Sequence, residues 1–226
     1  MKVLVSDFDH TFFNLKFEEN IEAINNFVNR GNVFIIATGR NYSLLKEEIE
    51  YYDIKYSFLI CKDGGVIFDR TGREIYRKNI DIDIAKKIYK FLNKSRGVPE
   101  VLLDTGVEFT SNVETPSISI IAKYVDHEKG EIILDKIKNE FPEIDGYLSE
   151  TWINILDKEV SKGNAINKLI SALNISKDAV YTIGDGINDV SMNSMFKGYA
   201  MPDSVDELKK VSIETVSSFK SFVDSL

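Results

Sequence analysis

Two aspartates stand one residue apart directly after the first apolar run of the sequence. Residues 5–11 read VSDFDHT, so Asp7 and Asp9 follow a short β-rich stretch. Like charges at this spacing repel each other, so we expect either a turn whose side chains bond the local backbone or an opposing cation. A carboxylate can also attack phosphorus as a covalent nucleophile while a second carboxyl group moves the proton. The pair is therefore a candidate nucleophile and proton shuttle.

Three further apolar runs also end in polar residues and glycines. They end at residues 38–40 (TGR), 62–65 (KDGG) and 184–189 (GDGIND). In an open parallel sheet, ligands bind outside the carboxyl ends of the strands. If these runs are neighbouring parallel strands, all four polar ends meet at one edge of the sheet.

That convergence predicts a metal site. It brings Asp185 and Asp189 next to Asp7, with Asp9 nearby. Such a carboxylate cluster requires a cation, and a set of oxygen ligands suits Mg²⁺. An isolated copy of the 184–189 segment reads equally well as a plain loop rich in glycine, asparagine and aspartate.

Other residues at these strand ends suit the binding of a phosphoryl group. The Thr38 hydroxyl, the Gly39 amide and the ammonium of Lys162, in the segment SKGNAI at a predicted helix start, can bind phosphoryl oxygens. Each has an ordinary explanation when taken alone. Thr38 and Gly39 can form a common strand-to-helix turn, and Lys162 can cap a helix or lie in solvent.

The elements that must position these residues indicate an α/β fold with an insert. Up to residue 79, buried strands alternate with helices, and their continuous apolar runs are typical of a parallel sheet covered on both faces. Between residues 80 and 156 the order becomes that of an α+β unit. There we predict a helix over 82–92, strands around 100–111 and 117–124, a helix over 128–140 and strands within 146–156.

From Ser161 the α/β alternation resumes, with a helix over 162–173, the strand AVYTIGDG, a short helix after Asp189 and the strand GYAM. We therefore predict a Rossmann-like, three-layer core built on a parallel sheet. Residues 1–79 and 157–226 form this discontinuous core domain, and residues 80–156 form an inserted, smaller α+β domain.

Composition narrows the class of partner. The 226 residues carry 28 Lys and Arg against 36 Asp and Glu, a net charge of −8, which argues against a nucleic-acid footprint. The single cysteine, Cys61, excludes an internal disulfide and suits a reducing compartment. No stretch approaches the ~20 apolar residues that a membrane span needs. The apolar run at the N-terminus is too short for the apolar region of a signal peptide. We expect a cytoplasmic protein with a small phosphorylated metabolite as substrate, no nucleic-acid partner and no membrane contact.

Four segments, DFDHT, ATGR, SKGNAI and GDGINDVSM, stand in the order and approximate spacing of the four motifs of the haloacid dehalogenase superfamily. The sequence most resembles its Cof-type phosphatases, whose α/β cap (type IIB) lies between motifs two and three. The similarity covers nearly the whole chain. Each short motif is weak alone, and their order around a cap-sized insert makes them specific.

The resemblance implies a role for each motif residue. It makes Asp7 the nucleophile that forms an aspartyl-phosphate and Asp9 the general acid and base. Thr38, Gly39, Lys162 and Asn188 would bind the phosphoryl group.

The resemblance also implies a Mg²⁺ site. The Asp7 carboxylate, the Asp9 backbone carbonyl and Asp185 would hold the ion, with Asp189 as a direct or outer ligand. Branches of the superfamily that do not hydrolyse phosphate esters usually lack an acid at the position of Asp9, so its presence favours phosphatase or phosphomutase chemistry.

Several alternatives stay open at this stage. A phosphomutase would use the same two aspartates, and a non-catalytic phosphometabolite-binding protein could share the fold. Asp63 replaces the asparagine common before the glycine in the family's NG segment, and the insert is short, which leaves the substrate open. Arg40 could contact the substrate or pair with an acid. Tyr147 and Trp152 could line the pocket, but we expect them in the core of the insert.

Overall fold

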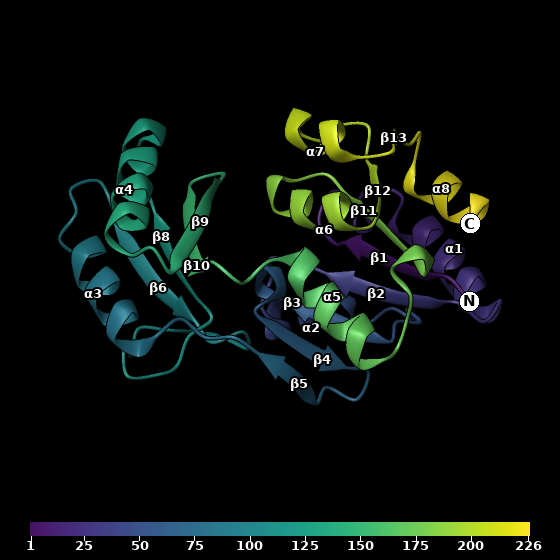
Figure 1. Cartoon of the computed structure of the whole chain (residues 1–226), viewed down its shortest axis with the longest axis horizontal. Helices are drawn as coiled ribbons and strands as arrows, with labels where there is room; N and C mark the ends of the chain where they lie inside the picture. The colour runs from purple at the N-terminus through teal and green to yellow at the C-terminus, as the bar shows by residue number, and fades with distance from the viewer.

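The computed structural model describes all residues, 1–226, and divides the chain into two parts (Figure 1). An eight-stranded sheet with its helices forms one part, here called the core, and both chain termini lie in it on the side away from the second part. A five-stranded sheet with two helices forms the second part, here called the cap. None of the helices has the length and apolar character needed to cross a membrane.

The core sheet is parallel over six neighbouring strands and ends in an antiparallel hairpin. In spatial order its strands are β13 (Glu214–Thr215), β12 (Lys197–Ala200), β11 (Val180–Gly184), β1 (Val3–Asp7), β2 (Val33–Ala37), β3 (Phe58–Cys61), β4 (Val66–Asp69) and β5 (Glu74–Arg77). Strand β1 lies between β2 and β11, with Asp7 opposite Ala37 and Ser6 opposite Ile183. The carboxyl ends of these three strands therefore meet at one edge, as predicted.

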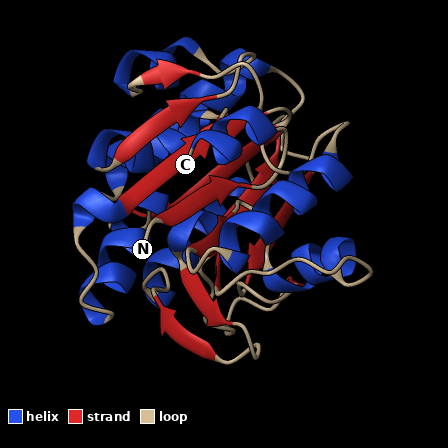
Figure 2. Ribbon diagram, turned by 90° about the vertical axis from the view of Figure 1, so that its right-hand side faces the viewer, coloured by secondary structure: helices blue, strands red, loops and turns tan.

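Helices cover both faces of the core sheet (Figure 2). On one face, α1 (Phe17–Asn29), α2 (Tyr42–Ile49) and α8 (Phe219–Ser225) pack against side chains such as Leu4, Phe34 and Ile36. On the other face, α5 (Lys162–Ala172) and α6 (Val190–Met195) pack against Val3, Val5 and Ile35. Helix α7 (Asp206–Val211) lies beside α6 and β12. Burial on both faces explains the continuous apolar runs of these strands.

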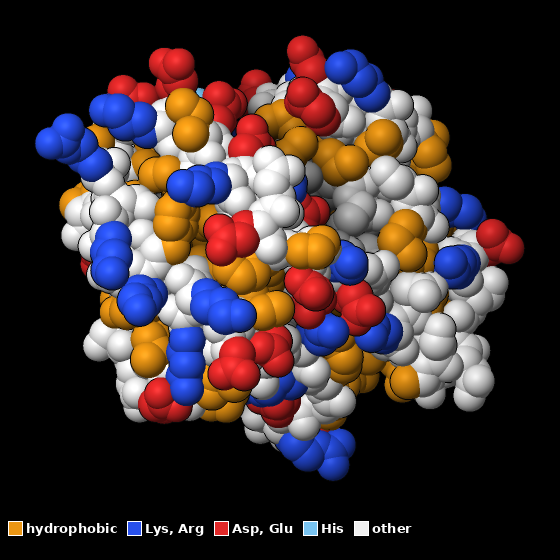
Figure 3. Space-filling model, turned by 60° about the vertical axis from the view of Figure 1, so that its left-hand side comes forward, with side chains coloured by type: hydrophobic (Ala, Val, Ile, Leu, Met, Phe, Trp, Pro, Cys, Tyr) orange, Lys and Arg blue, Asp and Glu red, His pale blue; other side chains and the backbone are white.

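The cap is a two-layer unit with its own apolar core. Its antiparallel sheet has the order β7 (Phe109–Thr110), β6 (Glu100–Asp104), β8 (Ser119–Lys123), β10 (Trp152–Asp157) and β9 (Ile144–Ser149). Helices α3 (Ile82–Leu92) and α4 (His127–Glu140) cover one face of this sheet, and together they bury a separate apolar cluster. On the cap side of the molecule shown in Figure 3, acidic and basic side chains are interspersed among apolar ones.

Local sequence signals explain where several helices begin. The Asn41 side chain accepts a hydrogen bond from the backbone N–H of Leu44 at the start of α2, and Ser161 accepts one from Asn164 at the start of α5. Asp81 and Asp126 cap α3 and α4 in the same way. These side chains satisfy N–H groups that have no partner within the helix.

The predicted elements are confirmed with small shifts at their ends. The helix predicted over 82–92 is α3, and the helices predicted over 128–140 and 162–173 are α4 and α5. The fold class, a three-layer α/β core with a smaller antiparallel cap, is also confirmed. Every strand of the second sheet lies between residues 100 and 157, although the limits of the two domains stay a prediction. The two-residue strand β13 was not predicted.

An aromatic cluster packs around Phe12 in the loop that follows Asp7, and we expect it to contribute to the stability of the fold. The fully buried ring of Phe12 lies 5.1 Å from Phe17, 5.2 Å from Phe34 and 5.3 Å from Phe219, between ring centroids. We expect Phe12→Ala to lower the free energy of unfolding by about 3–5 kcal/mol, measured by urea denaturation, because it leaves a cavity.

Leu15, three residues later and fully exposed, provides the matched control. Leu15→Ala should change the free energy of unfolding by less than about 0.5 kcal/mol. A loss below 1 kcal/mol for Phe12→Ala would contradict the role assigned to this ring.

Candidate active site

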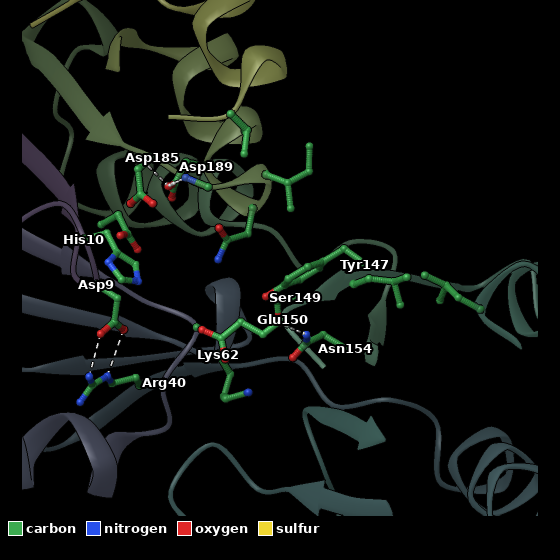
Figure 4. A pocket seen from close by; sticks show the side chains of 18 of the residues that line it. Asp9, His10, Arg40, Lys62, Tyr147, Ser149, Glu150, Asn154, Asp185 and Asp189 are labelled. Atoms are coloured by element: carbon green, nitrogen blue, oxygen red, sulfur yellow. Dashed lines mark hydrogen bonds and ion pairs between the residues drawn. The ribbon is translucent and has the colours of Figure 1, made fainter. Parts of the chain in front are cut away.

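A cavity of about 1330 Å³ lies between the carboxyl edge of the core sheet and the cap. Figure 4 shows Asp9, Asp185 and Asp189 projecting from the core and Tyr147, Ser149 and Asn154 projecting from the cap. Most of the lining side chains are polar. The predicted convergence of the strand ends therefore occurs at the floor of an accessible cavity.

A buried ammonium group holds two of the acids together. The Nζ atom of Lys162 lies 2.5 Å from Asp7 Oδ1 and 2.6 Å from Asp189 Oδ1, and the lysine side chain is fully buried. Burial alone would lower the pKa of Lys162, but the charges of Asp189 and Asp7 outweigh it and raise the pKa. Lys162 is therefore a permanent positive charge beneath the carboxylates.

Asp189 uses both of its carboxylate oxygens within the protein. Oδ1 accepts from Lys162, and Oδ2 accepts from the backbone N–H groups of Asp185 and Gly186, each at 2.9 Å. Gly184 makes room for this arrangement, because a Cβ atom there would approach Asp189 Oδ2 to 2.3 Å. Asp189 thus folds the loop that carries Asp185, which supports an outer position for it around a metal.

Asp7 and Asp185 line the cavity and are the two acids best placed to meet a bound ligand. Single ligand atoms of Asp7, Asp185 and Asp189 all lie within 4.8 Å of one another, and the Thr11 hydroxyl donates to Asp185 Oδ1 at 2.7 Å. Burial raises the pKa of Asp7 well above its usual value, although Lys162 opposes the shift, and burial also raises the pKa of Asp185. Three carboxylates lie together with a single ammonium, which contacts two of them, so the hard oxygen donors and the surplus negative charge fit a divalent cation.

Asp9 lines the cavity and forms a two-point ion pair with Arg40 (Figure 4). Arg40 Nη2 lies 2.7 Å from Asp9 Oδ1, and Arg40 Nε lies 3.0 Å from Asp9 Oδ2. Arg40 also pairs with Glu48 at 3.1 Å, and its guanidinium lies over the ring of Phe8. Of the two possibilities for Arg40, pairing with an acid is the one that the structure shows.

The residues expected to bind phosphate lie on both sides of Asp7. The β1–β2 register places Ala37 opposite Asp7, so Thr38, which is fully buried, follows directly beside it. The bare Cα of Gly39 faces Asn188: a Cβ atom there would lie 3.7 Å from Asn188 Nδ2. Gly39 and Asn188 line the cavity, and the buried Thr38 and Lys162 lie next to Asp7, which also lines it.

The expectation that Tyr147 belongs to the core of the insert is wrong. Tyr147 lines the cavity, and its hydroxyl donates to Asp63 Oδ2 across the interface at 2.8 Å. It lies on β9, an edge strand of the cap sheet, where a side chain can face the core of the molecule. The same expectation is wrong for Trp152, which lies outside the apolar cluster of the cap. It is half-buried on the neighbouring strand, with the Lys123 ammonium 5.7 Å from its ring centroid.

Two further residues of the site were not assigned roles from the sequence. Thr11 orients Asp185, and its place at the polar end of the first strand was the available signal. Lys62 lines the cavity, and its ammonium lies 3.4 Å from Asp104 Oδ2 in the cap, with both side chains buried. Its place at the polar end of a buried strand was the available signal, but its partner Asp104 lies in a separate sheet and was not predictable from that signal.

The chain is similar to a known family and to several characterised proteins. The model of the haloacid dehalogenase-like hydrolase family matches residues 4–108 and 102–221. The chain is 26% identical to the 5-amino-6-(5-phospho-D-ribitylamino)uracil phosphatase YcsE of Bacillus subtilis, over 94% of this chain and 88% of that protein.

Solved structures share the fold over the whole chain. A haloacid dehalogenase-like hydrolase from B. subtilis superposes with a TM-score of 0.87 at 20% identity, covering 100% of this chain and 98% of the other. A HAD subclass IIB sugar phosphatase superposes with a TM-score of 0.81 at 20% identity, covering 100% and 96%. The chain therefore belongs to the haloacid dehalogenase-like hydrolase family, as its motif order predicted.

Proposed function

We propose that the protein is a Mg²⁺-dependent phosphatase that hydrolyses a small phosphorylated metabolite through an aspartyl-phosphate at Asp7. One observation carries this proposal. Asp7 lies at the end of a central strand, 2.5 Å from a buried ammonium and beside Asp185, at the floor of a cavity that also holds Asp9. A nucleophile, a phosphoryl-binding cation and a candidate proton shuttle thus share one small volume.

The chain's own residues account for both halves of the reaction. An Asp7 carboxylate oxygen forms a bond to phosphorus as the bond to the leaving oxygen breaks, and Asp9 gives that oxygen a proton. Asp9, now a carboxylate, then takes a proton from water as the water attacks phosphorus and releases Asp7. Lys162, the Gly39 amide and Asn188 bind the phosphoryl oxygens, on which charge develops in both transition states.

Asp7 and Asp185 would hold Mg²⁺, with the Asp9 carbonyl as a further ligand and Asp189 outside them. The ion would neutralise charge on the phosphoryl oxygens when bound. Thr11 keeps Asp185 oriented toward this position through its 2.7 Å hydrogen bond. The proposed ligand set thus comes from β1 and from the loop after β11, which the sheet places side by side.

In this mechanism the Asp9 carboxyl group must leave Arg40 and contact the bound ester. Both of its oxygens accept hydrogen bonds from Arg40, and a carboxyl group so paired cannot donate a proton. Its side chain is 40% exposed and lines the cavity, so it can turn toward a bound ester. We infer that substrate binding draws Asp9 away from Arg40.

The cavity wall favours a leaving group without a second negative charge. Glu131, Asp135 and Glu150 line it from the cap. The only lysine and arginine in the lining, Lys62 and Arg40, are paired with Asp104 and Glu48. A neutral, hydroxyl-rich group such as a sugar or polyol can hydrogen-bond to these acceptors, and the ribityl phosphate in the name of the B. subtilis relative is of this kind.

Replacement of the nucleophile tests the mechanism. We expect Asp7→Asn to abolish the release of inorganic phosphate from every ester that the natural protein hydrolyses, because an amide cannot form the phosphoenzyme. The exposed Asp53, changed to asparagine, is the matched control and should retain full activity. Phosphate release by Asp7→Asn at the natural rate would contradict the assignment.

Addition of Mg²⁺ to protein freed of metal by EDTA should raise Tm at pH 7.5. Saturation to 100 times Kd adds about 2.7 kcal/mol to the free energy of unfolding, or about 5–10 °C for a chain of this size. The shift should be smaller at pH 5: the raised pKa values of Asp7 and Asp185 keep protons bound to higher pH, and these protons compete with the metal.

Asp185→Asn provides the comparison for this thermal measurement. The variant should lose most of the Mg²⁺-dependent shift at pH 7.5, whereas Asp53→Asn should keep it. An equal shift in Asp185→Asn and the natural protein would place the metal elsewhere.

A panel of phosphate esters tests the substrate class. With Mg²⁺ present, we expect kcat/KM for sugar and polyol phosphates to exceed that for phosphoglycolate by about tenfold or more, because one unpaired charge at a site costs at least 1.4 kcal/mol. Accumulation of an isomeric phosphosugar instead of inorganic phosphate would indicate a phosphomutase. Preference for a substrate with a second acidic group would contradict the reading of the cavity wall.

A further inference from the structure

Asp63 joins three segments of the chain at the wall of the cavity. It follows β3 in a short 3₁₀ turn (Lys62–Gly64), and its backbone N–H donates to the Thr38 carbonyl at 3.0 Å. Its side chain is 4% exposed and lies against Gly39, where a Cβ atom would come within 3.3 Å of Asp63 Oδ1. Its φ angle of 56° lies in the left-handed region, so the backbone holds a conformation that costs about 1 kcal/mol or more.

Each oxygen of this carboxylate has a separate donor. Asn188 Nδ2 donates to Asp63 Oδ1 at 2.8 Å, and the Tyr147 hydroxyl donates to Asp63 Oδ2 at 2.8 Å. Burial and the negative charge of Asp63 raise the pKa of Tyr147, so the phenol remains a donor at neutral pH. A carboxylate accepts on both oxygens, whereas an asparagine would accept on one and turn its own N–H₂ group toward a donor.

The bond to Tyr147 lies at one edge of the cap, and the other edge is fixed differently. Near the β6–β7 edge, the Gly106 and Val107 carbonyls accept from the backbone N–H groups of Tyr42 and Ser43 at the start of α2. Asp104 adds contacts to Asn41 and Lys62 there. At the β9 edge, the Tyr147 hydroxyl donates a hydrogen bond to Asp63 of the core.

We propose that Asp63 is a positioning residue that couples the seating of the cap to the alignment of Asn188 at the phosphoryl site. The inference rests on the proposed function, because it takes Asn188 as a phosphoryl ligand. With the cap seated, Tyr147 fixes one oxygen of Asp63, and the other oxygen orients the Asn188 amide so that its second N–H is free for the phosphoryl group. Rotation of the cap about its β6–β7 edge breaks the Tyr147 bond first and releases this alignment.

Kinetics of three variants test the coupling. Asp63→Asn should lower kcat/KM by about 10–100-fold and weaken inhibition by inorganic phosphate, because a charge-assisted bond to Asn188 is lost. Tyr147→Phe should lower kcat/KM by about 3–10-fold and leave phosphate inhibition nearly unchanged. Because both changes act through one carboxylate, the double variant should be no worse than Asp63→Asn alone.

Tyr89→Phe, a cap tyrosine on α3 whose hydroxyl makes no side-chain hydrogen bond, is the matched control and should behave as the natural protein. Purely additive losses in the double variant, or natural phosphate inhibition in Asp63→Asn, would overturn the proposal. If the natural protein released phosphate from no ester, the proposed function would fail instead.

Hydrogen exchange gives a readout that does not depend on activity. In Asp63→Asn, amide exchange should speed up both in β9 (Ile144–Ser149) and in the loop 185–189, whereas in Tyr147→Phe it should speed up mainly in β9. Equal Tm values for the variants and the natural protein would exclude global destabilisation as the cause. Unchanged exchange in both segments of Asp63→Asn would overturn the coupling.

Discussion

A buried ammonium surrounded by carboxylates is the interaction on which the site depends. Lys162 is fully buried, and its contacts at 2.5 and 2.6 Å join Asp7 of β1 to Asp189 of the loop after β11. Breaking such a pair by removing one partner leaves an uncompensated buried charge, which typically costs 3–5 kcal/mol. The same ammonium offsets only part of the negative charge, and the remainder is what makes the edge of the sheet suited to a divalent cation.

The sheet topology brings the ammonium and the carboxylates together. Parallel pairing of β1 with β2 and β11 brings residues that are far apart in sequence to one edge, and helices pack against both faces of the sheet. The cap then encloses the edge and contributes polar side chains such as Ser149 and Asn154. In the proposed mechanism the reacting side chains lie on the core, and the leaving group contacts the cap.

The sequence predicts the core of the site because strand ends and motif spacing are local signals. Asp7, Asp185 and Lys162 meet as predicted, since each directly follows a buried strand or begins a capped helix. Tyr147 was misjudged for a physical reason. An aromatic residue on an edge strand can face the helices of its own domain or the other domain. Which of the two it faces depends on how the domains dock, and the alternation of residues along β9 does not predict that.

Arg40 illustrates the same limit at shorter range. Its sequence position allowed contact with either a substrate or an acid, and only the fold places Asp9 and Glu48 within reach of one guanidinium. The small strand β13 was missed because two residues carry no periodic pattern. Long elements and motif residues were therefore accessible from the sequence, and contacts between separately folded parts were not.

Anomalous diffraction from crystals soaked in Mn²⁺, a substitute for Mg²⁺, tests the shared cation most directly. We predict one strong peak about 2.0–2.3 Å from carboxylate oxygens of both Asp7 and Asp185, with the Lys162 ammonium still bound to Asp7 and Asp189. A peak at any other position, or no peak at this edge of the sheet, would contradict it.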